Sequence, residues 1–419
     1  MKDADRQFLI GMFKAAVAAA DPRHALASYI PKPPKGRTIL IGAGKGSAQL
    51  AAAFETLWKG LLEGVIVTRY GFGCPTKQIK VLEASHPVPD EAGLRSSYAL
   101  FDAVKNLTED DLVVALISGG GSALLPMPAE GLALQDEIDL NKALLASGAP
   151  ISVMNAIRKQ ISKIKGGSLA LACHPARVVS LIVSDIPGDN AADIASGPTV
   201  PSAASRAEAR ALIDAWRIQL PPRIAEFLKS DVNLPPISDD LRFATHDVHI
   251  IASARHSLEA AASYSEAAGI PAMILSDSIE GEASDVGTVH AALLREVALR
   301  DRPFKKPVVI LSGGETTVTL KSKGRGGRNS EFLLSLAIAA EGMSFAALAA
   351  DTDGIDGSEN NAGAFASGET ATRLRISGHN PRSLLAANDS YSAFEVLGDL
   401  FVTGPTGTNV NDFRAILLR

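Results

Sequence analysis

RTILIGAGKGSA at residues 37–48 and LVVALISGGGSALL at 112–125 decide the fold, because in each a run of aliphatic residues ends in a cluster of glycines. VVILSGGETTV at 308–318 has the same design, and KGRGGRNSEFLL at 323–334 is typical of a glycine loop that opens a helix. We predict that the first three are buried parallel strands that end in tight turns. Glycine has no Cβ, so its N–H groups approach an anion closely, and a following helix adds the positive end of its dipole.

Basic residues inside two of these loops indicate a ligand with several phosphates. They are Lys45 in the first loop, and Arg325 and Arg328 in the last. The loop around Lys45 is not a Walker A loop, because Ile39 stands where that motif needs its first glycine and Gly46 follows the lysine in place of Ser or Thr.

A dinucleotide-binding loop fits the same segment better, but incompletely. Gly42 and Gly44 match the motif, whereas Ser47 occupies the third glycine position, and the next strand ends in Arg69 rather than in an acid. An arginine there could meet the 2′-phosphate of NADP, so an NADP enzyme stays open as an alternative. A lysine in the loop suits the charge of a triphosphate better.

Composition is that of a globular enzyme. The 419 residues exceed what one core usually supports, so we expect two domains. Hydrophobic residues make up 46% and charged residues 21%, and the net charge of −5 argues against a nucleic-acid or anionic-membrane partner. Cys74 and Cys173 lack the spacing of a metal site and are expected to be free thiols in a reducing cytoplasm. Residues 1–22 are predicted to form an amphipathic helix, and no stretch is apolar enough to span a membrane.

The order of elements along the chain predicts the architecture. Short apolar runs alternate with helices, which indicates a doubly wound, mainly parallel α/β sheet with ligands at the carboxyl ends of its strands. Residues 230–246 are rich in proline and acids and mark a boundary, after which VHIIAS at 248–253 restarts the alternation. We therefore expect two α/β domains, at 1–240 and 241–419, with a cleft between them.

Clustered aspartates follow two of the predicted strands. Oxygen ligands at strand ends suit Mg²⁺, and one of the acids could serve as a base. For any single aspartate, helix capping or a local turn is the simpler interpretation. Two such clusters beside phosphate-type glycine loops nevertheless favour a metal and a base. The residues are Asp185, Asp189 and Asp193 in the first group, and Asp351, Asp353 and Asp356 in the second.

Other catalytic classes find little support. Ser122 follows three glycines without the Gly-x-Ser-x-Gly elbow, and the eight histidines show no zinc-binding spacing. His86 precedes a proline in a turn and could contact a ligand. The basic segment NAIRKQISKIKGG at 155–167 is expected to be mostly a solvated helix face.

Nine motifs, in order along almost the whole chain, resemble the bacterial glycerate 2-kinases that carry a C-terminal MOFRL domain, a family whose members were often labelled hydroxypyruvate reductases. The motifs are ILIGAGKGSA, EASHPVPDEAG, LISGGGSALL, NAIRKQISKIKGGSLA, VSDIPGDNAADIASGPT, SGGETTV, GRGGRNSEF, DTDGIDGSENNAGAF and LAANDSYSAFEVLGDLFVTGPTGTNVNDF. The resemblance implies a Rossmann-like N-terminal domain, a smaller C-terminal α/β domain with a mixed sheet, and an active site in the interdomain cleft. There ATP would phosphorylate the 2-hydroxyl of D-glycerate.

The resemblance implies that Lys45 and the arginines of GRGGRN contact phosphate, and it leaves the roles of Arg325 and Arg328 open between them. The remaining roles are hypotheses from the chemistry of phosphoryl transfer. The catalytic residues would be Lys45 and Arg325 on phosphate oxygens and Asp189 as the base. Glycerate would contact Arg328, Ser118, Ser122, His86 and Asn388. The nucleotide would lie on Lys45, Gly42, Gly44, Gly119, Gly120, Gly121, Gly313 and Gly314, and Mg²⁺ on Glu315, Asp351 and Asp353.

Three classes of function therefore remain open: a kinase of a small hydroxy acid, an NAD(P)H-dependent hydroxypyruvate reductase, and a nucleotide-binding sensor without chemistry. The sensor is the weakest, since binding alone needs no base. We expect a cytoplasmic protein that binds ATP and D-glycerate, with neither nucleic acid nor membrane as a partner. A homodimer is possible.

Overall fold

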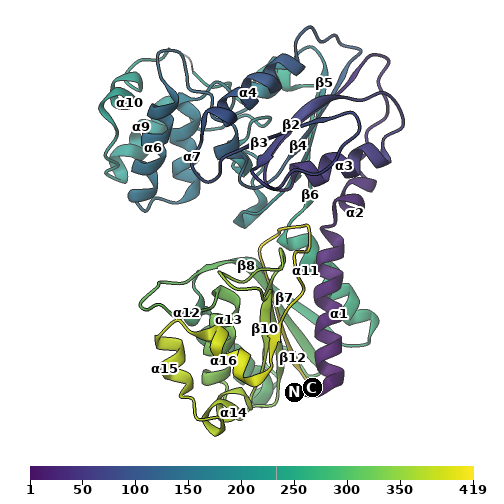
Figure 1. Cartoon of the computed structure of the whole chain (residues 1–419), viewed down its shortest axis with the longest axis vertical. Helices are drawn as coiled ribbons and strands as arrows, with labels where there is room; N and C mark the ends of the chain where they lie inside the picture. The colour runs from purple at the N-terminus through teal and green to yellow at the C-terminus, as the bar shows by residue number, and fades with distance from the viewer. Residues whose placement is uncertain (233) are drawn as a thin grey trace. The chain divides into compact units, whose positions relative to one another are not determined.

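The computed structural model describes residues 1–232 and 234–419, which form two compact units (Figure 1). We call them the parallel-sheet unit and the mixed-sheet unit. The parallel-sheet unit comprises Ala25–Ser184 and Asp189–Ile251. The mixed-sheet unit comprises Met1–His24, Asp185–Gly188 and Ala252–Arg419. These units differ from the consecutive ranges 1–240 and 241–419, because the first helix packs with the C-terminal part of the chain.

Six strands form the sheet of the parallel-sheet unit, in the order β3-β2-β1-β4-β5-β6. This is the Rossmann strand order, in which the chain direction across the sheet reverses between β1 and β4. The prediction of a doubly wound parallel sheet is confirmed. The strands are β1 (Thr38–Ala43), β2 (Glu63–Arg69), β3 (Lys80–Ala84), β4 (Leu112–Ile117), β5 (Arg177–Val183) and β6 (His246–Ala252).

The predicted aliphatic strands lie at the centre of this sheet. Every residue of β1 and β4 is buried, as expected for strands covered on both faces. A second core lies among α6, α7, α9 and α10, which Figure 1 shows grouped together. The helices are α3 (Ser47–Leu57), α4 (Glu91–Ala103), α5 (Gly121–Leu124), α6 (Leu134–Ala146), α7 (Ile151–Arg158), α8 (Ser168–Ala172), α9 (Arg206–Ala215) and α10 (Pro222–Phe227).

The strand expected to open the second half of the chain belongs instead to the first sheet. This strand, β6, is the edge strand beside β5. Its first residues are only partly buried, as is usual for an edge. The pattern predicted a strand correctly, but a strand's partner depends on long-range packing that the pattern does not contain.

The mixed-sheet unit has six strands in the order β11-β10-β9-β12-β8-β7. β7 and β8 run parallel, whereas β12 pairs antiparallel with both β8 and β9, so the predicted mixed sheet is confirmed. The last strand of the chain thus lies in the middle of the sheet (Figure 1). The strands are β7 (Ala272–Glu282), β8 (Val308–Thr317), β9 (Ala346–Asp351), β10 (Gly363–Ser367), β11 (Leu400–Phe401) and β12 (Asp412–Leu418).

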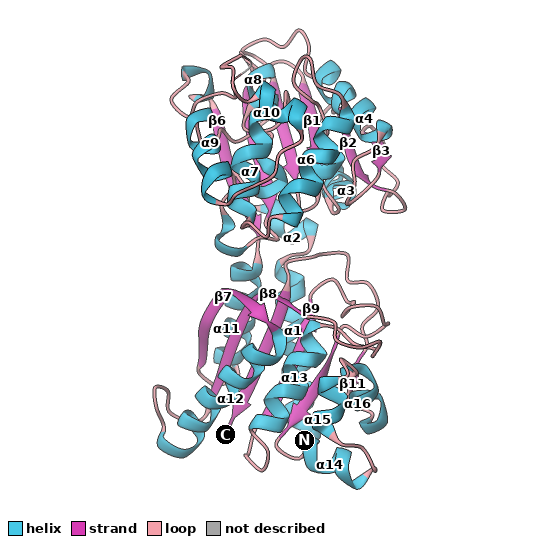
Figure 2. Cartoon of the chain, turned by 90° about the vertical axis from the view of Figure 1, so that its left-hand side faces the viewer, coloured by secondary structure: helices cyan, strands magenta, loops and turns pink. Residues whose placement is uncertain are grey.

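Helices cover both faces of this sheet, as Figure 2 shows. On one face, α1 and α11 pack against alternate residues of β8, β9 and β12, and the predicted amphipathic helix buries Leu9, Met12, Phe13 and Ala16 there. On the other face, α12 and α13 cover the remaining alternate residues. The helices of this unit are α1 (Asp3–Ala19), α11 (Ala254–Ala267), α12 (Ala283–Arg300), α13 (Arg328–Ala339), α14 (Thr370–Ile376), α15 (Pro381–Ala386) and α16 (Ser390–Leu397). The short helix α2 (Pro22–Ala27) includes residues of both units.

One predicted glycine turn is wrong. β8 does not stop at Gly313 and Gly314 but runs on to Thr317, with Gly314 paired to Asp412 on one side and to Ile279 on the other. Gly314 has a φ of +119°, and a Cβ there would lie 2.2 Å from the backbone nitrogen of Ile279. Gly314 therefore permits a close approach of β7 inside the sheet rather than a turn.

The sequence predicts no membrane span and two free cysteines. Within residues 1–232 and 234–419 no helix is long and apolar enough to cross a bilayer. Cys74 and Cys173 are both free, and burial raises the pKa of each thiol.

Candidate functional site

The two glycine loops of the parallel-sheet unit meet at the point where the strand order reverses. The N–H of Lys45 donates to the carbonyl of Gly119 (2.8 Å), and the N–H of Ser118 donates to the carbonyl of Ala43 (3.0 Å). The Ser118 hydroxyl also accepts from the N–H of Gly46 (3.0 Å). Both loops follow fully buried strands, so the sheet fixes where they lie. Open α/β sheets bind their ligands at this place.

Gly120 lies between two of the predicted site residues because it has no side chain. Its φ is +78°, and a Cβ at this position would lie 3.0 Å from Nε2 of His86 and 3.1 Å from Cε of Lys45. Gly44, with a φ of +140°, would place a Cβ 2.1 Å from the Ser118 hydroxyl oxygen. Bare backbone thus forms a cradle of the kind that phosphate groups use, with Lys45 and His86 at its side.

Positive charge at this edge is not balanced by an acid. No hydrogen bond or ion pair to the Lys45 ammonium occurs within the described part of the chain. Burial, reinforced by Lys45 and Arg69, lowers the pKa of His86 from its usual 6.5 to about 4. The imidazole is therefore neutral at pH 7 and can donate or accept a hydrogen bond beside two cations.

Ser122 joins a buried polar network rather than standing alone. Its hydroxyl lies 2.8 Å from that of Ser196, which in turn donates to Oδ1 of Asn155 (3.0 Å). Beside this pair, the ammonium of Lys159 lies 3.2 Å from Oδ1 of Asp193. The loop after β4 is thereby tied to α7 and to the segment that follows β5.

The interpretation of residues 155–167 as mostly a solvated basic face is wrong. The side chain of Lys159 is only 3% exposed and that of Lys165 only 1%, and Lys165 pairs with the equally buried Glu137. α7 ends at Arg158 and the chain continues as a short 3₁₀ turn, so the segment is not one helix. The sequence could not show this, because each buried cation depends on an acid from another part of the chain.

Asp189 lies after β5, in a strained conformation. It has a φ of +51°, is half-buried, and its carboxylate has no hydrogen-bond partner among residues 1–232 and 234–419. Non-glycine residues with such a φ are uncommon and often lie at functional sites. Asp185 is held through its backbone, since its carbonyl accepts from Nδ2 of Asn411 (2.8 Å).

A second charged cluster lies in the mixed-sheet unit around Arg328, the first residue of α13. Its guanidinium donates to three carboxylates at 2.7–2.8 Å: Nε to Asp412, Nη1 to Glu315 and Nη2 to Asp351. The other oxygen of Asp412 accepts from Arg414, a fully buried residue of β12. β8, β9 and β12 each contribute one of these carboxylates, because all three strands reach the same edge of the sheet.

Three carboxyl groups and two guanidiniums, those of Arg328 and Arg414, make up this cluster. Burial raises the pKa of Asp351 to about 8, against the opposing effect of Arg328. Burial also acts on Arg328, but Asp412, Asp351 and Glu315 outweigh it and hold the guanidinium pKa above its usual range. Asp351 therefore holds a proton for most of the time at pH 7, and a bound cation would favour its loss. Carboxylate oxygens are the ligands that Mg²⁺ prefers. In the described residues no three such side chains are grouped as a preformed metal site, since the guanidinium lies among them.

The remaining predicted residues of this unit have structural partners. Arg325 is exposed, pairs with Glu395 (2.8 Å) and stacks on Tyr391. The Asn388 side chain accepts from the N–H of Lys321 (2.7 Å) and so holds the loop before α13. Asp353 accepts from the N–H of Ile355 (2.8 Å), which is a local turn contact.

The N-terminus of α13 is already occupied by a carboxylate. Asp356 accepts from the backbone N–H groups of Asn329 and Ser330 (2.9 Å each), and a Cβ on Gly327 would lie 2.4 Å from it. The glycine loop at 323–334 does open a helix, as predicted. Its glycine makes room for a capping aspartate from the chain itself, so these N–H groups are not available to phosphate.

The predicted residues thus fall into two groups, one in each unit. The parallel-sheet unit holds Gly42, Gly44, Lys45, His86, Ser118, Gly119, Gly120, Gly121, Ser122 and Asp189. The mixed-sheet unit holds Gly313, Gly314, Glu315, Arg325, Arg328, Asp351, Asp353 and Asn388. Sequence reasoning missed Lys159 and Asp412. An available signal for Asp412 was its position in the NVNDF motif, directly before the last aliphatic run.

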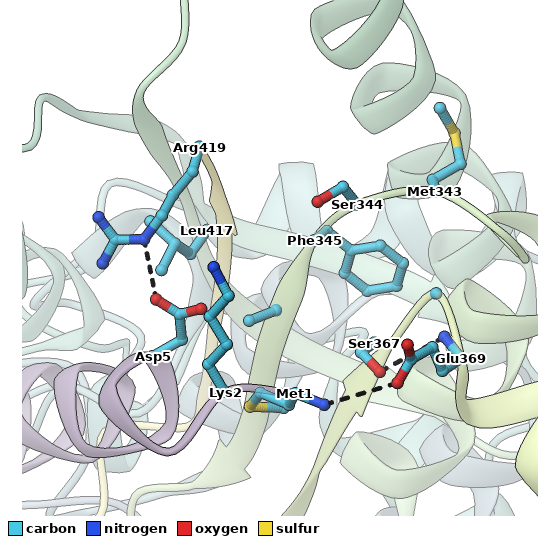
Figure 3. Close-up of a pocket in the computed structure, with 12 residues that line it drawn as sticks. Met1, Lys2, Asp5, Met343, Ser344, Phe345, Ser367, Glu369, Leu417 and Arg419 are labelled. Carbon is cyan, nitrogen blue, oxygen red and sulfur yellow. Dashed lines mark hydrogen bonds and ion pairs between the residues drawn. The ribbon is translucent and has the colours of Figure 1, made fainter.

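A cavity of about 380 Å³ lies elsewhere in the mixed-sheet unit (Figure 3). Its lining includes residues at the start of β9 and at the end of β12. Asp351 and Asp412 lie at the other ends of these two strands. Arg419 donates to Asp5 across one wall (2.8 Å), and the Met1 amino group lies 3.9 Å from Glu369 at another. None of the predicted site residues lines it.

Two family models match the chain. Residues 8–229 match the model described as a domain of unknown function (DUF4147), and residues 308–412 match the MOFRL family. The first match alone covers more than half of the chain. These two matches coincide with the motifs that carry the glycine loops and the aspartate clusters.

Named relatives extend over nearly the whole length. The chain is 38% identical to the D-glycerate 2-kinase of Thermotoga maritima over 410 residues, which covers 97% of each protein. It is 49% identical over 417 residues to a protein of Agrobacterium vitis that bears the name "Putative hydroxypyruvate reductase", covering 99% of this chain and 94% of the relative.

Solved structures agree with these relatives. The crystal structure of glycerate kinase from Thermotoga maritima matches with a TM-score of 0.91 at 36% identity, and the match covers 100% of both chains. The family models, the relatives and the fold lead to the same conclusion, which is that this chain belongs to the glycerate kinase family.

Proposed function

We propose that this protein is an ATP-dependent glycerate 2-kinase, which converts D-glycerate and ATP to 2-phospho-D-glycerate and ADP. The observation that carries the proposal is the unpaired Lys45 ammonium beside Gly120, at the switch point of a Rossmann sheet. Relatives of the same length that are named glycerate 2-kinases support it.

In phosphoryl transfer the protein mainly positions the reactants and neutralises the negative charge on the oxygens of the transferred phosphoryl group. Lys45 and the backbone N–H groups of Gly119–Gly121 would contact phosphate oxygens. Arg325 would join them by leaving Glu395, and an exposed ion pair of that kind costs little to break. Gly42 and Gly44 keep the loop close enough to the neighbouring strand for this arrangement.

Asp189 would act as the base. As the 2-hydroxyl oxygen bonds to the terminal phosphorus of ATP, its proton passes to the Asp189 carboxylate and the bond from phosphorus to the ADP oxygen breaks. The absence of a hydrogen-bond partner for this carboxylate within the described ranges leaves it available to a substrate hydroxyl. His86 and the hydroxyls of Ser118 and Ser122 would help to orient the acid.

The acids of the mixed-sheet unit would hold Mg²⁺, which neutralises charge on phosphate oxygens when it is bound. Glu315 and Asp351 would supply carboxylate oxygens for this role, with Asp353 beside them, and Asp351 would give up its proton to the solvent as the cation binds. In our proposal Arg328 organises this cluster, because its donors already face three carboxylates. The carboxylate of glycerate therefore needs a different cation.

The reductase name carried by some relatives is the second candidate. It would require a nicotinamide nucleotide at the same switch point, where β2 ends in Arg69 instead of the acid that binds the ribose of NAD. The lysine beside the glycine cradle favours the kinase. We keep the reductase as the direct competitor in the assay.

Purified protein should be incubated with D-glycerate, ATP and Mg²⁺, and separately with hydroxypyruvate and NADH or NADPH. We expect ADP formation in the first mixture and no oxidation of the nucleotide in the second. Phosphorus NMR should show 2-phosphoglycerate as the first product, and enolase should convert it to phosphoenolpyruvate without a mutase. First appearance of 3-phosphoglycerate would overturn the regiochemistry, and reductase activity alone would overturn the kinase.

A further inference from the structure

Four adjacent strands of the parallel-sheet unit place one residue each around the same point. Lys45 follows β1, Arg69 is the last residue of β2, His86 follows β3, and Gly120 follows β4. These strands are neighbours in the order β3-β2-β1-β4. Because parallel strands end at one edge of a sheet, the side chains converge there. Arg69 is the one member that the proposed kinase mechanism leaves without a role.

The guanidinium of Arg69 is held in place but is not neutralised. Its central carbon lies 3.4 Å from the centre of the Phe72 ring, so the group stacks on an aromatic face. Nε is buried without a hydrogen-bond partner, and no acid in residues 1–232 and 234–419 pairs with the guanidinium. The two terminal nitrogens of this planar fork are thus left for a ligand.

The surroundings of Arg69 add positive charge instead of removing it. Lys45 also has no partner in the described part of the chain, and both cations act on His86. Like charges at a half-buried edge repel, so an arrangement that stacks one cation and leaves both without an acid is stabilised when an anion binds. The ligand that this edge fits carries an oxyanion group.

We infer that Arg69 binds the carboxylate of the acid substrate, next to the phosphoryl group held by Lys45. A guanidinium forms two parallel hydrogen bonds to a planar carboxylate, whereas a compact ammonium suits a phosphoryl oxygen. The identity of the acid as glycerate rests on the proposed function. The presence of an oxyanion site at Arg69 does not.

Direct binding gives the test. D-glycerate should be titrated into the protein by calorimetry, with and without ADP, and ATP should be titrated separately. The variants are Arg69→Gln, which removes the charge, and Arg69→Lys, which keeps the charge but loses the fork. Arg95→Gln is the control, since Arg95 is an exposed arginine of α4 in the same unit.

We expect Arg69→Gln to weaken D-glycerate binding by about tenfold or more, the size of a charge-assisted pair of hydrogen bonds, and to raise the KM for glycerate similarly. Arg69→Lys should recover part of this loss. ATP affinity, the thermal unfolding midpoint and the behaviour of Arg95→Gln should stay close to the wild type.

Three results would overturn the inference. The first is unchanged glycerate affinity in Arg69→Gln. The second is a loss of ATP affinity instead, which would assign Arg69 to a nucleotide phosphate. The third is no glycerate binding by the wild type. Failure of the proposed function looks different: glycerate binding would depend on Arg69 while ATP and glycerate gave no phosphoglycerate. If Arg69→Gln does not fold, Arg69→Lys decides the question by the same titrations.

Discussion

The two charged clusters of this protein handle charge in opposite ways. At the edge of the parallel sheet, Lys45 and Arg69 have no acid partner among the residues that the structure describes. Around Arg328, by contrast, three carboxylates share one guanidinium, and Asp412 uses both of its oxygens. In our proposal the first cluster binds an anion. The second is already held together by ion pairs within the chain.

This difference separates two kinds of evidence for function. An unpaired cation at a strand end indicates a ligand directly, because a charge without a counterion is costly in a half-buried place. A cluster whose charged groups are already paired with one another indicates a structural role. A ligand could bind there only by replacing one of the existing contacts. Substitutions should therefore affect ligand binding and catalysis in the first cluster, and folding in the second.

The largest effect is expected at Asp412. Asp412→Ala leaves the buried Arg414 without its carboxylate and should lower the free energy of unfolding by about 3–5 kcal/mol. Urea unfolding followed by circular dichroism measures this loss. Asp102→Ala, which breaks the exposed pair with Lys105, is the matched control and should cost about 1 kcal/mol or less. Equal losses in both variants would contradict a structural role for the Arg328 cluster.

Substitution of Lys45 should lower catalytic activity and leave stability unchanged. If the ammonium neutralises charge as the phosphoryl group moves, Lys45→Ala should lower kcat by about 10²-fold or more without shifting the unfolding midpoint. Lys45→Arg should rescue poorly, since a planar fork does not replace a compact ammonium. Lys59→Ala, at an exposed lysine of the same unit, should behave like the wild type. Full turnover in Lys45→Ala with a normal melting curve would remove this residue from the site.

The smallest effect concerns pH, the buried His290 and the half-buried His86. Burial lowers the pKa of His290 to about 4, as it does for His86. Between pH 6.5 and 4 the unfolded chain binds protons that the folded chain does not, so stability falls as pH falls, by up to about 1.4 kcal/mol per pH unit for one such group. His290→Gln should flatten this slope in urea unfolding between pH 7 and 4.5.

An anion should distinguish the two histidines. Glycerate or inorganic phosphate near Lys45 and Arg69 should raise the pKa of His86, because it offsets the two cations beside that ring. His290 faces Arg414, whose charge Asp412 already balances, so its pKa should not change. NMR titration of the imidazole signals checks both expectations. Equal shifts at His86 and His290 would show that the anion does not act at the parallel-sheet edge.

The sequence predicted the fold well where local pattern and burial agree. β1 and β4 are aliphatic throughout and end in glycines that must turn, so their place at the centre of a parallel sheet followed from the pattern. The pattern failed at Gly313 and Gly314, because a glycine that admits a neighbouring strand looks the same in sequence as a glycine that turns. Only the close approach of Ile279 distinguishes the two cases.

The sequence identified candidate site residues, but it did not show which residues they contact. The sequence pattern groups the aspartates after β9 as metal ligands, yet Asp351 pairs with Arg328, Asp353 makes a local turn and Asp356 caps α13. The contacts of Asp351 and Asp356 join residues that lie apart in the sequence. The contact of Asp353 depends on the local backbone conformation. Lys159 was hidden for the same reason, since its partner Asp193 lies 34 positions away.

The central place of β12 has a consequence for how the protein is made. Strands β9–β11 and strands β7–β8 are joined in the sheet only through β12, which is synthesised after all of them. Both halves of this sheet are therefore synthesised before the strand that joins them. During that interval β8 and β9 each present an unpaired edge, so the nascent chain is open to strand pairing with other chains. Deletion of residues 412–418 would leave a full-length set of helices without the strand that closes the sheet.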